Sequence, residues 1–145
     1  MIGLLQRVTQ ASVAVDARLV SSIGTGLLVL VGVQKDDTEA QAGRLLERVL
    51  GYRVFPDEQG RMNRSLADIS GGLLLVPQFT LAADTRKGSR PGFSTAAEPA
   101  RARELFEFLL SRARASHAPV GAGEFGADMK VSLINDGPVT FWLES

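Results

Sequence analysis

Runs of apolar residues, separated by turn-forming residues, predict β-strands over the first third of the chain. Three short runs cover residues 2–8, 12–15 and 19–23, and the turn-prone pair Asp16 and Ala17 separates the last two. Residues 27–33 are apolar at nearly every position, which is typical of a strand buried on both faces. The pattern predicts a meander with one nearly fully buried strand.

Helical spacing replaces the strand pattern in the next segment. Apolar residues recur at i, i+3, i+4 and i+7, and these are Ala42, Leu45, Leu46 and Val49. Thr38 and Gln41 precede them in a capping-box arrangement. We therefore expect one amphipathic helix over residues 39–52.

The middle of the chain reads as turn, strand and loop. Turn residues dominate positions 56–60, the short segment 62–65 follows, and residues 72–78 form a second apolar strand. Residues 82–94 contain two glycines, one proline and three basic residues, a composition that favours a loop.

A second helix should follow this loop, and strands should complete the chain. Thr95 and Glu98 form a second predicted capping box, with Pro99 tolerable in the first turn. The predicted apolar face consists of Ala102, Leu105, Phe106, Leu109 and, more weakly, Ala113. Residues 120–123, 130–135 and 139–143 return to a strand pattern.

The elements together predict an α+β fold of about eight strands and two amphipathic helices. Hairpin-length connections favour a mainly antiparallel sheet or open barrel packed against the helices. The 145 residues are 45% hydrophobic, enough for a substantial core, and no linker or repeat divides them. We expect a single domain over residues 1–145.

Composition narrows the chemistry that is available. Sixteen basic residues balance sixteen acidic ones, so a nucleic-acid partner would have to meet a local patch. Cysteine is absent, which excludes disulfides, thiolate nucleophiles and sulfur-ligated metals. No secretion signal or membrane-spanning run is evident, so we expect a cytoplasmic protein without a membrane or DNA partner.

The standard catalytic groups are missing from the motifs. His117 is the single histidine, and its place at the polar end of the second predicted helix favours a solvated residue over a catalytic base. With one histidine, no cysteine and no clustered carboxylates, we expect no metal site. No dinucleotide or P-loop motif is present, so we expect no cofactor. Catalysis would depend on hydroxyls, amides, backbone groups or the substrate itself.

Two strand ends carry a family resemblance. Residues 77–81 read Pro-Gln-Phe-Thr-Leu, and residues 135–140 read Asn-Asp-Gly-Pro-Val-Thr. They resemble the Ser-Gln-Phe-Thr-Leu and Asn-x-Gly-Pro-Val-Thr segments of the D-aminoacyl-tRNA deacylase family, and their joint occurrence is far more specific than either alone. The likeness extends along the whole chain, for example through 60–63, 86–88 and 125–129. Pro77 departs from the family's usual serine, which leaves any polar role of position 77 in doubt.

The resemblance implies an editing hydrolase that cleaves D-aminoacyl-tRNA to tRNA and amino acid. It implies a catalytic segment with Gln78 and Thr80, and substrate contacts from Phe79, Met129 and Asn135. From the residues alone, an ordinary strand end with satisfied polar groups would be the better interpretation of segment 78–80.

The resemblance also implies a device for chiral selection. The Gly137-Pro138 bond is expected to be cis, and this element of one subunit is expected to enter the pocket of the other and exclude L-amino acids. The working unit would then be a homodimer. Without the resemblance, a hairpin turn would be the better interpretation of residues 135–140.

Two mechanisms and one other class of protein compete. Thr80 could attack the ester, but no histidine is present to take its proton. Alternatively, the free ribose hydroxyl of the terminal adenosine could assist water, which the missing base favours. The rival class is a non-catalytic module that binds a metabolite at a subunit interface.

Contact with the tRNA acceptor end would need local positive charge. Arg86, Lys87 and Arg90 lie in the loop just after the first motif and are candidates for phosphate contacts. A charged loop that is merely solvated is the competing interpretation.

Overall fold

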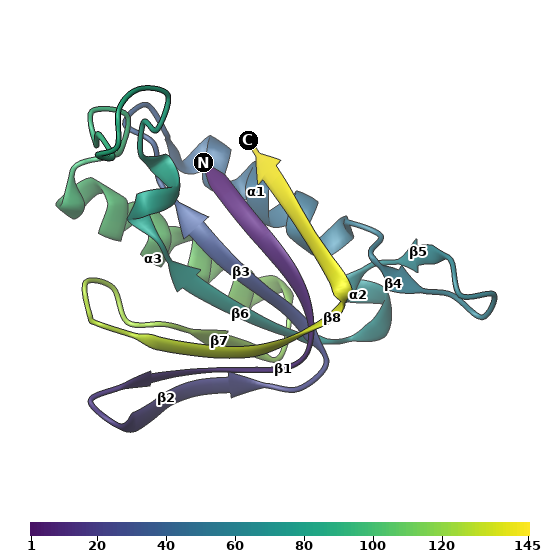
Figure 1. Cartoon of the computed structure of the whole chain (residues 1–145). Helices are drawn as coiled ribbons and strands as arrows, with labels where there is room; N and C mark the ends of the chain where they lie inside the picture. Colours follow the sequence, from purple (N-terminus) through teal and green to yellow (C-terminus); the bar gives the residue numbers. More distant parts are fainter.

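The computed structural model describes all residues from 1 to 145, which form a six-stranded mixed sheet with helices packed on it and a separate two-stranded sheet. The strands are β1 (Ile2–Val15), β2 (Arg18–Ile23), β3 (Gly26–Gly32), β4 (Phe55–Pro56), β5 (Met62–Arg64), β6 (Gly72–Pro77), β7 (Val120–Ala122) and β8 (Lys130–Glu144). The helices are α1 (Glu39–Gly51), α2 (Leu66–Ile69), the 3-10 turn η1 (Phe79–Ala82) and α3 (Pro99–Ser116). Figure 1 shows α1 and α3 together on one side of the sheet.

The main sheet has six strands in a nearly closed, barrel-like curve. Strand β1 pairs antiparallel with β2, β3 and β8, while β3 with β6 and β6 with β7 are parallel. Strand β2 curls back far enough to contact β6 and β7. The short strands β4 and β5 form a separate hairpin that projects from the barrel (Figure 1). The predicted α+β class is confirmed, with more parallel pairing than expected.

Two pairs of predicted strands are single long strands in the structure. Residues 2–8 and 12–15 are both part of β1, and residues 130–135 and 139–143 are both part of β8. Thr9 and Gln10, which break the apolar pattern, are exposed residues within β1. The register between β1 and β8 shifts on both sides of Val8, as in a β-bulge that lets a strand bend without ending.

Alternate residues of the central strands face two separate cores. Leu27, Val29 and Val31 of β3 pack in the larger core with α1 and α3, whereas Leu28 packs in a smaller core inside the barrel. Strand β6 divides its residues in the same way. The predicted burial of strand 27–33 on both faces is confirmed, because helices cover one face and the curled sheet covers the other.

The predicted apolar faces of both long helices are confirmed, but only one of the two predicted capping boxes is present. Thr38 and Gln41 form the capping box of α1, which ends at Gly51 with Tyr52 as its C-cap. Helix α3 begins after Glu98, which makes no side-chain cap. The predicted capping box at Thr95 is wrong, because the Thr95 hydroxyl donates a hydrogen bond to the Ala82 carbonyl. The predicted apolar faces of both helices are buried.

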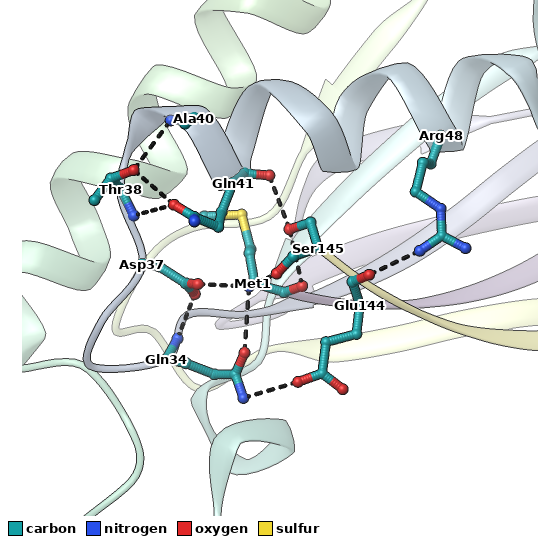
Figure 2. Close-up of polar contacts among 9 residues, drawn as sticks. All are labelled: Met1, Gln34, Asp37, Thr38, Ala40, Gln41, Arg48, Glu144 and Ser145. Carbon is teal, nitrogen blue, oxygen red and sulfur yellow. Dashed lines mark hydrogen bonds and ion pairs between the residues drawn. The ribbon is translucent and has the colours of Figure 1, made fainter.

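The two ends of the chain meet beside α1 (Figure 2). The buried Met1 ammonium donates to Asp37 Oδ1 at 2.6 Å and to the Ser145 carbonyl at 3.2 Å. Ser145 N–H in turn donates to the Met1 carbonyl at 3.0 Å. These contacts fasten β1 and β8 at the end of the sheet where β6 also ends. No helix of the chain is both long enough and apolar enough to cross a membrane.

Candidate active site

The candidate site forms where β6 ends. Gln78 N–H donates to the Val31 carbonyl at 2.8 Å, which keeps the chain on β3 for one residue beyond the strand. The backbone then turns into η1, and Leu81 N–H donates to the Gln78 carbonyl at 3.2 Å. A Cβ at Gly32 would lie only 2.9 Å from Leu81 Cβ, so the turn packs directly on the end of β3.

A pocket of about 460 Å³ opens at this strand end. Eight of its thirteen lining residues are hydrophobic, a composition suited to a ligand with an apolar body and a few polar groups. The lining residues are Val76, Pro77, Gln78, Phe79, Ala97, Pro99, Ala102, Phe125, Gly126, Ala127, Asp128, Met129 and Val131. Asp128 is the single charged residue among them, and its carboxylate pairs with Lys130 at 3.3 Å.

Gln78 and Thr80 form an amide–hydroxyl pair beside the pocket. Gln78 Nε2 donates a hydrogen bond to Thr80 Oγ1, and the Thr80 side chain is exposed. No histidine, lysine or glutamate lines the pocket, and its one carboxylate, Asp128, pairs with Lys130 and makes no hydrogen bond to Thr80. The arrangement can orient a hydroxyl or water, but it does not supply an activated nucleophile.

His117 lies outside the pocket. It is the C-cap residue of α3, and its Nε2 is 2.7 Å from the Gly71 carbonyl oxygen. Gly71 precedes the start of β6, whereas the pocket lies at the opposite end of that strand. The side chain is half-buried and hydrogen-bonded rather than simply solvated.

The second motif is a bend within β8 and not a hairpin turn. Asn135 Oδ1 accepts from Val139 N–H at 2.8 Å, and Asn135 Nδ2 donates to Thr140 Oγ1 at 2.8 Å. Arg7 holds the bend from β1, donating to the carbonyls of Asp136 at 3.0 Å and Val54 at 2.7 Å. Residues 135–140 therefore continue one strand around a bulge braced by side chains.

Gly137 and Pro138 are exposed at this bend, and the peptide bond between them is cis. Gly137 has a φ of +137°, a conformation that L side chains rarely adopt. A Cβ there would lie 2.6 Å from Val139 Cγ2 and 3.3 Å from Arg7 Nη2. Glycine is thus required both by the backbone conformation and by the packing of its neighbours.

The structure gathers only some of the predicted site residues. Gln78, Phe79 and Met129 line one pocket, and Thr80 is joined to it through Gln78. Asn135, Gly137 and Pro138 are absent from the pocket wall of their own chain. Asn135 uses its amide to brace the bend, so its predicted contact with substrate has no support within one chain.

The loop that carries Arg86, Lys87 and Arg90, here called the basic loop, is closed at its base. One of these three predicted phosphate ligands is bound to an acidic residue, and the other two are not. Asp84 and Gly92 form a two-bond bridge, with N···O distances of 2.7 and 3.0 Å. Arg86 binds Asp84 in a bidentate manner, at 2.9 and 2.8 Å. Hydrogen bonding from Arg86 lowers the pKa of Asp84 far below its usual range. Lys87 and Arg90 are exposed and make no ion pair.

Sequence reasoning missed two aromatic residues of the site. Phe93 follows the basic loop and packs on Phe79, with ring centroids 5.2 Å apart and both rings substantially exposed. Phe125 lines the pocket and lies beneath the guanidinium of Arg103. Neither belongs to a periodic pattern, but an aromatic residue among glycines and prolines is a signal that could have been followed. No three histidine, aspartate or glutamate side chains come together as a metal site would require.

Known proteins match this chain over nearly its whole length. The family model described as D-Tyr-tRNA(Tyr) deacylase matches residues 4–144. A D-aminoacyl-tRNA deacylase from Alkalilimnicola ehrlichii is 68% identical over 145 residues, covering 100% of this chain and 97% of that protein. One from Stutzerimonas stutzeri is 61% identical over 145 residues, covering 100% of both.

Two solved structures share the fold. One, described as c-Myc DNA Unwinding Element Binding Protein, has a TM-score of 0.96 and 38% identity, covering 100% of this chain and 99% of that one. Another, described as a probable eukaryotic D-amino acid tRNA deacylase, has a TM-score of 0.78 and 18% identity, covering 99% and 98%. At that identity the second likeness shows the fold alone.

The chain is an α+β barrel with a pocket at the end of β6, and the relatives that match it are deacylases. These features identify it as a hydrolase. The chain belongs to the D-aminoacyl-tRNA deacylase family. The predicted family and enzyme class are both confirmed.

Proposed function

We propose that this protein hydrolyses the ester bond of D-aminoacyl-tRNA, and also that of glycyl-tRNA, while sparing L-aminoacyl-tRNA. The observation that carries the proposal is the pocket itself. Its apolar wall, with Gln78 and Thr80 beside it and no base hydrogen-bonded to Thr80, suits a substrate that brings its own reactive hydroxyl. An aminoacyl ester of a terminal ribose is such a substrate.

The chemistry divides between the substrate and the protein. The free ribose hydroxyl next to the ester assists the attack of water, and the pocket holds the two in place. The hydrogen bond from Gln78 to Thr80 fixes both side chains beside the ester. Backbone N–H groups of the same segment supply donors for the oxyanion as it develops.

Chiral selection in this proposal requires two copies of the chain. Gly137 and Pro138 are exposed on β8 and do not line their own pocket. Supplied by a partner, they would present backbone where the side chain of an L-amino acid would have to lie. The same strand exposes Ile134 and Trp142, each about half accessible at 51%, and these would give a homodimer an apolar contact surface.

The tRNA partner is held by few charges. Of the three predicted phosphate ligands, Lys87 and Arg90 are free to contact phosphates, whereas Arg86 is occupied by Asp84. Since the net charge is zero, we expect only the acceptor end to be bound, with little discrimination among tRNAs. The protein would act in the cytoplasm, where charged tRNA is found.

The decisive experiment incubates the protein with D-tyrosyl-tRNA and, separately, with L-tyrosyl-tRNA. The proposal requires rapid loss of the D ester only. A non-catalytic binding module would leave both esters intact, and a non-selective esterase would cleave both. Either result would contradict the proposed function.

A further inference from the structure

An unpaired arginine, Arg103, lies at the rim of the pocket beside Phe125 and Gly126. Helix α3 contributes Pro99 and Ala102 to the pocket wall, and Arg103 is the next residue, on the exposed face. Its guanidinium carbon lies 5.0 Å from the centre of the Phe125 ring. A Cβ at Gly126 would be 3.9 Å from Arg103 Nη2, so the charged group borders two residues of the wall.

Arg103 differs from most other arginines near the site because no acidic side chain neutralises it. Arg86 is bound to Asp84 at 2.8 Å, and Arg101 to Glu104 at 2.9 Å. Arg103 takes part in no ion pair and donates no hydrogen bond, so its donors face solvent. Stacking on an aromatic ring holds a guanidinium in one orientation while leaving its edge free for an anion.

The substrate restricts what that anion can be. The amino acid's carboxylate is esterified, and its α-amine is neutral or cationic, so neither is attracted as an anion to a guanidinium. The negative charges nearest the ester are the phosphodiesters of the terminal nucleotides, and a planar guanidinium binds phosphate oxygens in pairs.

We infer that Arg103 binds the phosphodiester that links the terminal adenosine to the nucleotide before it. The inference rests on the proposed function and adds to it a binding residue on α3.

The test compares Arg103→Gln and Arg103→Lys with a matched control, Arg112→Gln. Arg112 is on the same helix, and its guanidinium also lies over an aromatic ring, 5.9 Å from the centre of Phe108, but Phe108 does not line this pocket whereas Phe125 does. Each variant is assayed on D-tyrosyl-tRNA and on the D-tyrosyl ester of adenosine, which has no phosphate. Circular dichroism and thermal unfolding verify that the variants are folded.

On D-tyrosyl-tRNA, Arg103→Gln should lower kcat/KM roughly 10- to 100-fold, mainly by raising KM, as expected for one lost charged hydrogen-bonding contact. Arg103→Lys should recover part of the loss, and Arg112→Gln should match the wild type. On the adenosine ester all four proteins should be equal. The slope of log(kcat/KM) against log[salt] on tRNA should be smaller by about one for Arg103→Gln.

Three results would overturn the inference. An equal loss on both substrates would mean that Arg103 only supports Phe125. An unchanged kcat/KM and salt slope on tRNA would mean that no phosphate is bound. Failure of the wild type to cleave D-tyrosyl-tRNA would refute the proposed function and this inference with it. The first two results leave the wild type active, so they refute only the inference.

Discussion

At the scale of single residues, the mechanism is constrained by the small number of reactive side chains at the site. Gln78 donates to the Thr80 hydroxyl, and no base is hydrogen-bonded to that hydroxyl, because the pocket's one carboxylate, Asp128, pairs with Lys130 instead. A hydroxyl without a base is a weak nucleophile at neutral pH. We therefore favour the mechanism in which the substrate's ribose hydroxyl assists water, with Thr80 only positioning groups.

Replacing Thr80 by alanine tests this assignment. We expect kcat/KM on D-tyrosyl-tRNA to fall by no more than about fivefold, the effect of one neutral hydrogen bond. A tRNA ending in 2′-deoxyadenosine and charged at the 3′ position should react roughly 10²- to 10⁴-fold more slowly with the wild type, the range for loss of general-base assistance. A folded but inactive Thr80→Ala enzyme, together with an active deoxy substrate, would restore Thr80 as the nucleophile.

At the scale of elements, the parallel pair of β3 and β6 places the pocket. The two strands start beside one another at Gly26 and Gly72 and end together at Val31 and Pro77. Their starting backbones approach so closely that a Cβ at Gly26 would meet the Gly72 carbonyl oxygen. Because both strands are buried on two faces, this contact has no direction in which to relax.

Two glycine-to-alanine changes should therefore have opposite effects on stability. Gly26→Ala should destabilise the protein by about 3 kcal/mol or more, the upper part of the range for overpacking. Gly43 lies inside α1, and a Cβ added there would have no atom within 4 Å, so Gly43→Ala should stabilise by roughly 0.5–1 kcal/mol through helix propensity. Urea unfolding of both variants measures the difference. Similar free energies of unfolding for the two would show that β3 and β6 are not so close.

At the scale of the whole molecule, the two motifs lie apart within one chain. Residues of the first motif line the pocket, whereas Gly137 and Pro138 are exposed at the bend of β8. If both motifs serve one reaction, a second copy must bring them together. In the proposal, the homodimer is therefore needed for selective activity and is not merely a state of assembly.

Dilution should reveal this requirement. Specific activity on D-tyrosyl-tRNA should be constant at high enzyme concentration and fall once the concentration drops below the dimer dissociation constant. Sedimentation at the same concentrations should show monomer appearing in parallel. A monomer with full activity and full preference for the D ester would contradict the shared-site proposal.

Glycyl-tRNA tests how the L-amino acids are rejected. A filter made of partner backbone excludes an amino acid only by collision with its side chain, and glycine has none. We expect glycyl-tRNA to be hydrolysed more slowly than D-alanyl-tRNA, because one methyl group in a pocket contributes about 1–3 kcal/mol. L-alanyl-tRNA should be stable. Assaying the three esters at one enzyme concentration decides the matter, since a glycyl ester as stable as the L-alanyl one would require active binding of D side chains.

The sequence by itself determined which faces are buried and which residues belong to the motifs. Spacing identified the apolar faces of α1 and α3, because helix periodicity is a local property of the chain. It did not show that β1 and β8 are continuous, because a bulge and a turn both interrupt an apolar pattern, and only pairing between distant strands tells them apart.

Only the tertiary structure decided which motif residues share a site. Asp84 sequesters Arg86, while Arg103 is left unpaired beside Phe125. Asn135 braces a bend instead of lining the pocket. These outcomes depend on contacts between side chains from separate elements, which have no period along the chain. The physical reason is that local patterns fix burial and element type, whereas a site is made by elements that meet only when the sheet has curled.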